Sequence, residues 1–262
     1  MDEVLNMSQT VFMIHGMTAG GWIWEHYQKF FENKGYTCIT PTLRHHAGDP
    51  EAIPDPALGT TSILDYVDDL AKEIRTLKTR PIIIGHSMGG LIAQILGSKG
   101  LASALVLLSP APPAGISIFH WSLLKGPWPS VVRFGFWKTP IKQSYEELKY
   151  SLLNQTPEKE GKTLYDRLGY ESGRAVWEIG FWWLDSKKAT RVNEANITCP
   201  VLLIGGSKDR IIHTSVVMKI AKKYESVATY KEFPDHAHNI LWEPGWEEVT
   251  EYIHGWIREK HP

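Results

Sequence analysis

The chain has 262 residues, of which 43% are hydrophobic and 22% are charged, and its formal net charge is −1. This composition is typical of a folded globular protein, and the length fits one large α/β domain. A net charge near zero gives no broad attraction to nucleic acid or to an anionic membrane surface, so we expect neither as a partner.

Residues 1–6 carry two acidic side chains and lack the basic start and apolar centre of a secretion signal. No apolar stretch approaches the roughly 20 residues that a membrane-spanning helix needs. The two cysteines, Cys38 and Cys199, lie in or beside apolar runs and indicate buried thiols rather than a disulfide framework. We therefore expect a cytoplasmic protein without a transmembrane segment.

Short apolar runs alternate with amphipathic helical stretches along most of the chain. In chain order the sequence predicts strand 11–14, helix 22–33, strand 37–40, helix 62–78, strand 81–84, helix 88–97, strand 104–108, strand 200–204, helix 214–224, strand 228–233 and helix 246–258. The helix over 62–78 has the clearest start, because Ser62 can cap it and Asp65 lies in its first turn. Strands that alternate with helices predict an α/β fold with a mostly parallel, doubly wound sheet.

Residues 111–195 interrupt this alternation and are rich in proline, glycine and aromatic residues. Helical patterns occur within them at 141–154 and 174–184. We predict a mainly helical insertion, or cap, that folds over the C-terminal edge of the sheet, where ligands bind in open α/β folds. The core domain would then comprise residues 1–110 and 196–262.

The sharpest motif is Gly85-His86-Ser87-Met88-Gly89-Gly90, which matches the Gly-x-Ser-x-Gly pattern of a nucleophile elbow. The elbow requires a buried strand before the serine and a helix after it, and both are predicted here. Ser87 would then stand at a helix N-terminus, where negative charge is stabilised. We predict Ser87 as a nucleophile; the alternative is an idle serine in a structural turn.

Acyl transfer needs donors for the oxyanion of its tetrahedral intermediate. The N–H of Met88, next to the nucleophile, and the N–H of Met17, in the loop after the first strand, are the predicted donors. Gly16, Gly20 and Gly21 do not have the spacing of a nucleotide-binding loop, so we expect no cofactor. No cluster of cysteine, histidine and carboxylate residues has the spacing of metal ligands, so we expect no metal.

A nucleophilic serine needs a base, and the base needs an acid that fixes its tautomer. Asp209 follows the strand over 200–204 and is the predicted acid; the alternative is a solvated loop aspartate. Two histidines, His236 and His238, follow the strand over 228–233 and compete as the base. We favour His238, because it immediately precedes the lead-in to the last helix, and expect His15 and His86 to be structural.

Together, in this order, these motifs resemble the α/β-hydrolase superfamily, particularly its esterase, monoacylglycerol-lipase and lysophospholipase-like members, over nearly the whole chain. The resemblance implies a Ser87–His238–Asp209 triad with Met17 and Met88 as oxyanion donors. Relatives usually have glycine where this chain has Ala237, a departure next to the predicted base. Serine in the nucleophile position argues against dehalogenases and epoxide hydrolases, which use aspartate there.

The sequence therefore predicts a serine hydrolase that cleaves small-molecule esters with short or medium, or lipid-like, acyl groups. The alternatives are a carbon–carbon-bond or lactone hydrolase, or a ligand receptor with vestigial hydrolysis. Aromatic residues of the insertion would line an apolar substrate pocket, or hold the insertion together, and an apolar edge could touch a lipid surface. We select Trp128, Trp137, Trp182 and Trp183 as pocket residues. Both a monomer and a homodimer remain open.

Overall fold

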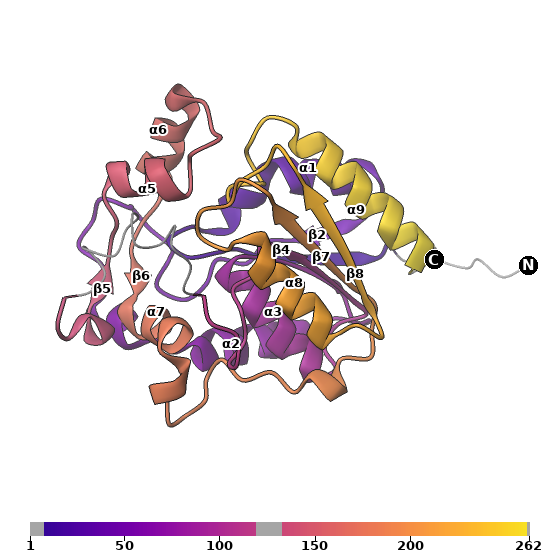
Figure 1. Ribbon diagram of the computed structural model, residues 1–262, viewed down its shortest axis with the longest axis horizontal. Coiled ribbons are helices and arrows are strands. Elements are labelled where there is room, and N and C mark those ends of the chain that lie inside the picture. The colour runs from indigo at the N-terminus through magenta and orange to yellow at the C-terminus, as the bar shows by residue number, and fades with distance from the viewer. Residues whose placement is uncertain (1–7, 119–132, 261–262) are drawn as a thin grey trace, which may run out of the picture.

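The computed structural model describes residues 8–118 and 133–260, and its centre is a six-stranded parallel sheet (Figure 1). The strand order is β2-β1-β3-β4-β7-β8. The chain moves to one side of β1 to form β2 and returns to the other side to form β3, so the order reverses between β1 and β3. The strands are β1 (Thr10–Ile14), β2 (Thr37–Ile39), β3 (Ile82–His86), β4 (Ala104–Leu108), β7 (Val201–Gly206) and β8 (Ala228–Phe233).

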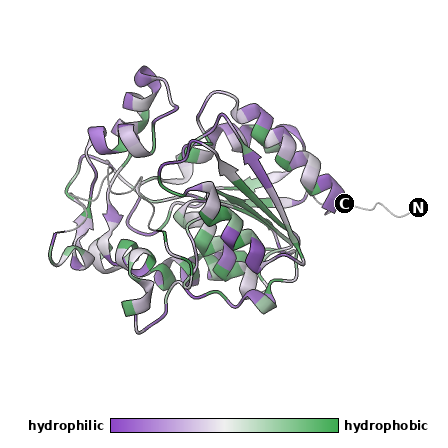
Figure 2. Ribbon diagram, in the orientation of Figure 1, coloured by the Kyte–Doolittle hydropathy of each residue, from purple (hydrophilic) through white to green (hydrophobic). Residues whose placement is uncertain are grey.

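Helices cover both faces of the sheet, which confirms the predicted doubly wound α/β fold. Alternate side chains of each strand enter different layers of the core: Phe12 and Ile14 pack in one cluster, Val11 and Met13 in the other. The hydropathy colouring shows apolar residues along the central strands, a more polar β8 at the edge, and mixed polar and apolar residues along α8 and α9 (Figure 2). One layer contains α2 (Ile63–Ile74), α3 (Met88–Ser98) and α8 (Thr214–Lys223), and the other contains α1 (Glu25–Asn33) and α9 (Trp246–Lys260).

Helix α2 begins where the sequence predicts, with Ser62 and Asp65 forming a reciprocal capping box. It ends at Ile74, four residues earlier than predicted. The predicted end was too late because Leu77, the last residue of the apolar stripe, is not helical but still packs against the core from the turn after the helix. The apolar pattern therefore extends beyond the helix itself.

Residues 111–195, called the inserted segment from here on, connect β4 to β7. Its elements β5, α5, α6, β6 and α7 lie on the side of the molecule away from the C-terminal end of α9 (Figure 1). A short antiparallel ribbon joins β5 and β6, through the pairs Pro140–Ser172 and Ile141–Glu171. The described elements are η4 (Phe136–Lys138), β5 (Pro140–Ile141), α5 (Tyr145–Ser151), α6 (Glu158–Arg167), β6 (Glu171–Ser172), α7 (Gly173–Gly180), η5 (Trp182–Leu184) and η6 (Glu194–Asn196).

Two helix predictions in the inserted segment need correction. The predicted helix over 141–154 begins as strand β5, and α5 starts only after Ser144, whose side chain caps it together with Glu147. Helix α6 was not predicted, because its sequence is mostly polar and has few apolar residues to show a stripe. The predicted helix over 174–184 is divided into α7 and the short 3₁₀ helix η5.

Within the part of the chain that the structure describes, no helix is both long enough and apolar enough to cross a membrane.

Candidate active site

Ser87 stands alone between β3 and α3, so the chain turns from strand to helix at a single residue. Its backbone has φ 53° and ψ −120°, a conformation that is strained for a residue with a side chain. The turn is possible because Gly85 and Gly89 lack side chains. A Cβ at Gly85 would overlap the backbone of Gly89, and one at Gly89 would overlap the carbonyl of Ile14. The motif therefore forms the nucleophile elbow that its residue types require.

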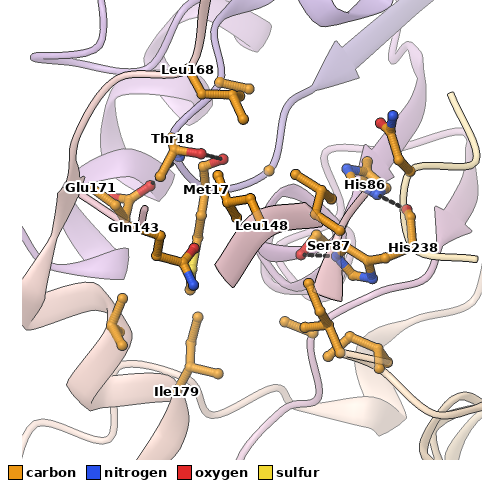
Figure 3. Close-up of a pocket in the computed structure, with 18 of the residues that line it drawn as sticks. Met17, Thr18, His86, Ser87, Gln143, Leu148, Leu168, Glu171, Ile179 and His238 are labelled. Carbon is orange, nitrogen blue, oxygen red and sulfur yellow. Dashed lines mark hydrogen bonds between the residues drawn. The ribbon is translucent and has the colours of Figure 1, made fainter. Parts of the chain in front are cut away.

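The structure brings Ser87, His238 and Asp209 into one hydrogen-bonded line. Nε2 of His238 lies 2.9 Å from the Ser87 Oγ (Figure 3), and Nδ1 lies 2.8 Å from Oδ2 of Asp209. All three residues are buried or nearly so. They come from the loops after β3, β7 and β8, which open at the same edge of the sheet because the strands are parallel. An imidazole held in this way can accept a proton from the serine hydroxyl.

His236, the histidine that competes with His238 as the base, contacts Glu243. Its Nδ1 is 3.2 Å from Oε2 of Glu243, which also accepts the N–H of Ala237 at 2.7 Å. Glu243 is almost fully buried and was not identified from the sequence, where no motif marks it. Its contacts fix the two residues before His238, so the loop presents His238 to Ser87.

His86 holds the same loop from the other side. Its Nε2 donates to the main-chain carbonyl of His238 at 2.8 Å, and the two rings are 5.0 Å apart. Burial lowers the pKa of His86 to about 3, so the ring is neutral at physiological pH. The predicted structural role of His86 is thus a specific one: it anchors the backbone of the candidate base.

The two predicted oxyanion donors lie beside Ser87. Met88 is the first residue of α3, where helix geometry leaves the N–H without an intrahelical acceptor. Met17 follows Gly16 in the loop after β1, and a Cβ at Gly16 would lie 3.1 Å from the Cβ of Ser87. No hydrogen bond from the N–H of Met17 is found among the described residues. Both amides are therefore available to an oxygen atom near Ser87.

His15 binds the N-terminal side of the Met17 peptide. Its Nε2 accepts the N–H of Leu43 at 3.0 Å, so the ring proton is on Nδ1, which donates to the carbonyl of Gly16 at 2.7 Å. That carbonyl and the Met17 N–H belong to one planar trans peptide and point in opposite directions. Burial lowers the pKa of His15 to about 3, so the ring keeps this neutral state.

A pocket of about 160 Å³ opens onto Ser87, His86 and His238 between the sheet edge and the inserted segment. Its wall is mostly aliphatic. The contributing apolar side chains are Met17, Ala19, Ile23, Ala111, Ile118, Ile141, Leu148, Leu152, Leu168, Val176, Ile179, Ile211 and Ile212. The polar lining residues include Thr18, Gln143, Glu171 and Asn239, of which Gln143 and Glu171 come from the inserted segment (Figure 3).

Three of the four predicted pocket tryptophans are not in this wall. Trp137, Trp182 and Trp183 do not line the pocket, and Trp183 is 51% exposed. They contact one another or neighbouring phenylalanines, as in the Trp182–Trp183 and Phe136–Trp137 pairs. Trp128 lies outside the described residues. The wall is built instead from branched aliphatic side chains, which pattern analysis cannot distinguish from ordinary core residues.

Glu171 is the pocket residue that sequence reasoning missed most clearly. It is buried and lies in a two-residue strand with no flanking motif. Its partners, Thr18, His46 and Tyr66, are more than one hundred residues away in the chain. Among residues 8–118 and 133–260, no group of three or more histidine, cysteine or acidic residues has the arrangement of a metal site.

Comparison with known families places these motifs in context. The family model described as the alpha/beta hydrolase family matches residues 11–251 of the chain. No curated protein sequence matches the chain significantly.

Solved structures resemble the chain over almost its whole length. A methylesterase from Arabidopsis shares 15% identity at a TM-score of 0.70, covering 95% of this chain and 99% of its own. An extracellular alpha/beta-hydrolase from a Paenibacillus species shares 17% at a TM-score of 0.73, covering 97% and 100%. A thermophilic esterase from Thermogutta terrifontis shares 20% at a TM-score of 0.69, covering 97% and 91%. At these identities the similarity establishes a common fold.

Proposed function

The chain belongs to the alpha/beta hydrolase family, and from that premise we propose that it is a serine hydrolase that cleaves carboxylic esters through an acyl-enzyme on Ser87. The observation that carries the proposal is the line from Ser87 Oγ through His238 to Asp209, with separations of 2.9 and 2.8 Å, at the mouth of an apolar pocket. Hydrogen-bonded serine, histidine and aspartate in this order are the parts that nucleophilic acyl transfer needs.

In the first half of the reaction, the Ser87 hydroxyl attacks the ester carbonyl while Nε2 of His238 accepts its proton. Asp209 holds Nδ1–H of the ring and stabilises the imidazolium that forms. The carbonyl oxygen becomes an oxyanion, which the N–H groups of Met17 and Met88 bind. A single donor of this kind typically lowers the barrier by about 3–4 kcal/mol.

Collapse of the tetrahedral intermediate expels the alcohol, which takes the proton from His238, and leaves the acyl group on Ser87. In the second half, His238 removes a proton from water, which attacks the acyl-enzyme at the same carbonyl carbon. The same two amides bind the second oxyanion, and the acid leaves with Ser87 restored.

The pocket supports a small apolar acyl or alcohol group as the preferred substrate part. A cavity of about 150 Å³ lined by aliphatic side chains is enough to hold a benzene-sized group, and this one measures about 160 Å³. The inserted segment supplies much of the wall, through residues such as Leu148 and Ile179. We propose that it is the cap that closes the substrate site. Two of the similar structures are named as a methylesterase and an esterase, which agrees with ester hydrolysis.

The proposal is tested by turnover of p-nitrophenyl acetate and butyrate by the wild type and by S87A. The wild type should hydrolyse both esters, and S87A should lose activity by several orders of magnitude while remaining folded. An active-site fluorophosphonate should label the wild type on Ser87 and leave S87A unlabelled. Equal turnover by both proteins would refute the assignment. Parallel assays with a lactone and a diketone distinguish an esterase from the alternatives on this scaffold.

A further inference from the structure

Glu171 lies in the pocket wall, on strand β6 of the inserted segment, and is only 1% exposed. Its carboxylate accepts four hydrogen bonds from protein groups. The donors are the N–H of Thr18 (3.1 Å), the N–H of Ser172 (2.7 Å), the hydroxyl of Tyr66 (3.0 Å) and Nε2 of His46 (3.1 Å). Two donors approach each oxygen, so protein groups rather than a ligand occupy the hydrogen-bonding positions of the carboxylate.

His46 balances the charge of this buried carboxylate. Its Nδ1 lies 2.9 Å from the carbonyl of Arg44 while its Nε2 contacts Glu171, so both ring nitrogens face acceptors. Only a protonated imidazole carries two N–H donors. Burial by itself would lower the pKa of His46, but the charge of Glu171 and the hydrogen bond to it raise the pKa above its ordinary value. The contact is therefore an ion pair between the inserted segment and the core.

The contact with Thr18 is the one that bears on catalysis. Thr18 directly follows Met17 and has φ 62°, which is unfavourable for a β-branched residue. Such a conformation persists only where the surroundings enforce it. Here the N–H of Thr18 binds Glu171, and its carbonyl accepts the N–H of Gly169 at 2.8 Å. Both contacts come from one short stretch of the inserted segment.

We infer that Glu171 is a positioning residue: it holds Thr18, and through it the Met17 amide, in the orientation that binds the oxyanion. Figure 3 shows Glu171 beside Thr18, with Met17 next along the loop toward Ser87. The inference rests on the proposed function, in which Met17 is an oxyanion donor. It makes the assembly of the oxyanion hole depend on the contact of Glu171 with Thr18, although Glu171 itself touches no reacting atom.

The expected kinetic effect is specific. An oxyanion donor binds the tetrahedral species far better than the ground-state ester, so its displacement lowers kcat more than it raises KM. A shift of about 1 Å in a positioned group can reduce the rate about 100-fold. Loss of the Glu171 contact should therefore decrease kcat by about 10- to 100-fold and leave KM within a few-fold.

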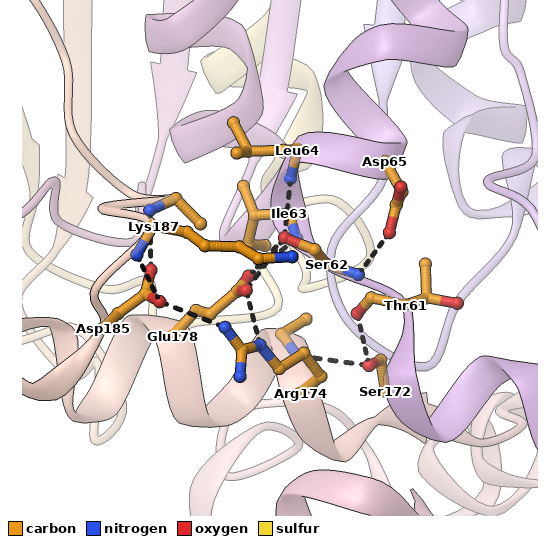
Figure 4. A network of polar contacts seen from close by, with 12 residues as sticks. Thr61, Ser62, Ile63, Leu64, Asp65, Ser172, Arg174, Glu178, Asp185 and Lys187 are labelled. Carbon is orange, nitrogen blue, oxygen red and sulfur yellow. Dashed lines mark hydrogen bonds and ion pairs between the residues drawn. The ribbon is translucent and has the colours of Figure 1, made fainter.

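Glu178 offers a matched control within the same segment. It is a buried glutamate on α7 that accepts the Ser62 hydroxyl at 2.8 Å and the Ile63 N–H at 2.9 Å, and it pairs with Arg174 at 2.7 Å (Figure 4). It thus docks the inserted segment onto the start of α2, but none of these partners belongs to the loop of Met17. Its loss should destabilise docking without a direct effect on the oxyanion donors.

The experiment compares E171Q and E171A with E178Q and E178A. In E171Q, one orientation of the new amide turns its NH₂ group toward the N–H of Thr18 and breaks that contact, whereas the other keeps the acceptor for Thr18 and turns the NH₂ group toward the N–H of Ser172. E171A removes both acceptors and breaks the hold on the loop outright. We would measure kcat and KM on p-nitrophenyl acetate, the thermal unfolding midpoint, and the inhibition constant of a trifluoromethyl ketone, which forms a tetrahedral adduct with a serine. The adduct reports on the oxyanion hole directly.

E171A should show the decrease in kcat and a matching loss of affinity for the ketone, and E171Q should show an equal or smaller loss of both. The Glu178 variants should lower the unfolding midpoint but keep kcat and ketone affinity within about twofold of the wild type, a change of less than about 0.5 kcal/mol. An unchanged kcat in folded E171A would overturn the inference. So would an equal loss of kcat and ketone affinity in E178A, because the effect would then follow general docking.

Failure of the proposed function gives a different result, because the wild type itself would then show no ester turnover that depends on Ser87. That result is obtained before any Glu171 variant is compared. Should E171A and E171Q not fold, E171D keeps the charge but withdraws the carboxylate from the N–H of Thr18 by one methylene, and so tests the same contact. A several-fold decrease in kcat without a change in KM is then expected. No decrease in folded E171D would also overturn the inference.

Discussion

Asp209 and His238 are 29 residues apart in the chain, yet one carboxylate oxygen of Asp209 lies 2.8 Å from Nδ1 of the His238 ring. The other oxygen accepts the N–H groups of Ile211 and Ile212, each at 2.8 Å. The carboxylate is thus held at both oxygens and cannot rotate away from the ring. This arrangement fixes the tautomer in which Nδ1 carries the proton and Nε2 faces Ser87.

Asp209→Asn should lower kcat by about 10⁴-fold with little loss of stability. The asparagine keeps the acceptor for the two backbone N–H groups, so its NH₂ faces Nδ1 and favours the tautomer with the proton on Nε2, which cannot accept a proton from serine. Steady-state kinetics on p-nitrophenyl acetate measure the effect. Asp235→Asn is the control, because the Asp235 side chain is 87% exposed in a nearby loop, where it pairs with Lys208. A D209N variant with near-normal kcat would remove Asp209 from the mechanism.

Two glycine-to-alanine substitutions should have opposite effects on stability. A Cβ at Gly89 would overlap the carbonyls of Ile14 and His15, whereas a Cβ at Gly255, within α9, meets no atom within 4 Å. Gly255→Ala should stabilise the fold by up to about 1 kcal/mol, because alanine is the better helix former. Gly89→Ala should destabilise it by several times that amount and abolish turnover, since the elbow must shift. Urea unfolding of both variants tests the contrast, and a stable, active G89A would contradict it.

The pocket volume predicts a preference for short acyl chains. Turnover of p-nitrophenyl esters should be highest for acetate or butyrate and fall toward octanoate and laurate. Leu152 lines the pocket and is only partly buried, so Leu152→Ala should widen the site and move the optimum toward longer chains. Leu153→Ala is the control, because Leu153 is a core residue that does not line the pocket. It should lower stability by about 2–5 kcal/mol without a change in acyl preference. An identical acyl profile in L152A would argue against this pocket as the acyl site.

The sheet and the positions of Ser87, Asp209 and His238 could be predicted because each has a local signal. Continuous apolar runs predict buried parallel strands, and residues directly after such strands must lie at one edge of the sheet. The elbow motif, an acid after one strand and a histidine after the next therefore converge without knowledge of side-chain contacts. Parallel topology converts chain order into spatial proximity for these three residues.

The pocket wall and the role of Glu171 could not be predicted for the opposite reason. The inserted segment has short elements, among them two-residue strands, and their apolar residues show no clear period. Tryptophan content suggested an aromatic wall, but Trp182 and Trp183 pack against each other while aliphatic residues line the cavity. Contacts such as Glu171 with Thr18 join residues 153 positions apart and depend on how the segment docks. No local pattern encodes that docking.

The Glu171–His46 ion pair makes a defined contribution to pH-dependent stability. Burial opposes the charge on both groups, yet their mutual attraction raises the pKa of His46 and lowers that of Glu171. A raised histidine pKa means that the folded protein holds the proton more tightly, so this stability is complete below the unfolded pKa of about 6.5 and is lost as pH rises through the folded pKa. For Glu171 it is present above about pH 4.3 and is lost as pH falls through its lowered pKa.

His46→Gln should therefore destabilise the protein most between about pH 5 and pH 6.5, and the difference in unfolding free energy from the wild type should shrink as pH rises further. Urea unfolding of both proteins across this range measures that difference, and subtraction removes the titration of all groups they share. His254→Gln supplies a control of opposite sign, because partial burial and the nearby Lys34 lower the pKa of His254. A His46→Gln penalty that stayed constant or grew with rising pH would mean that His46 is not the protonated partner of Glu171.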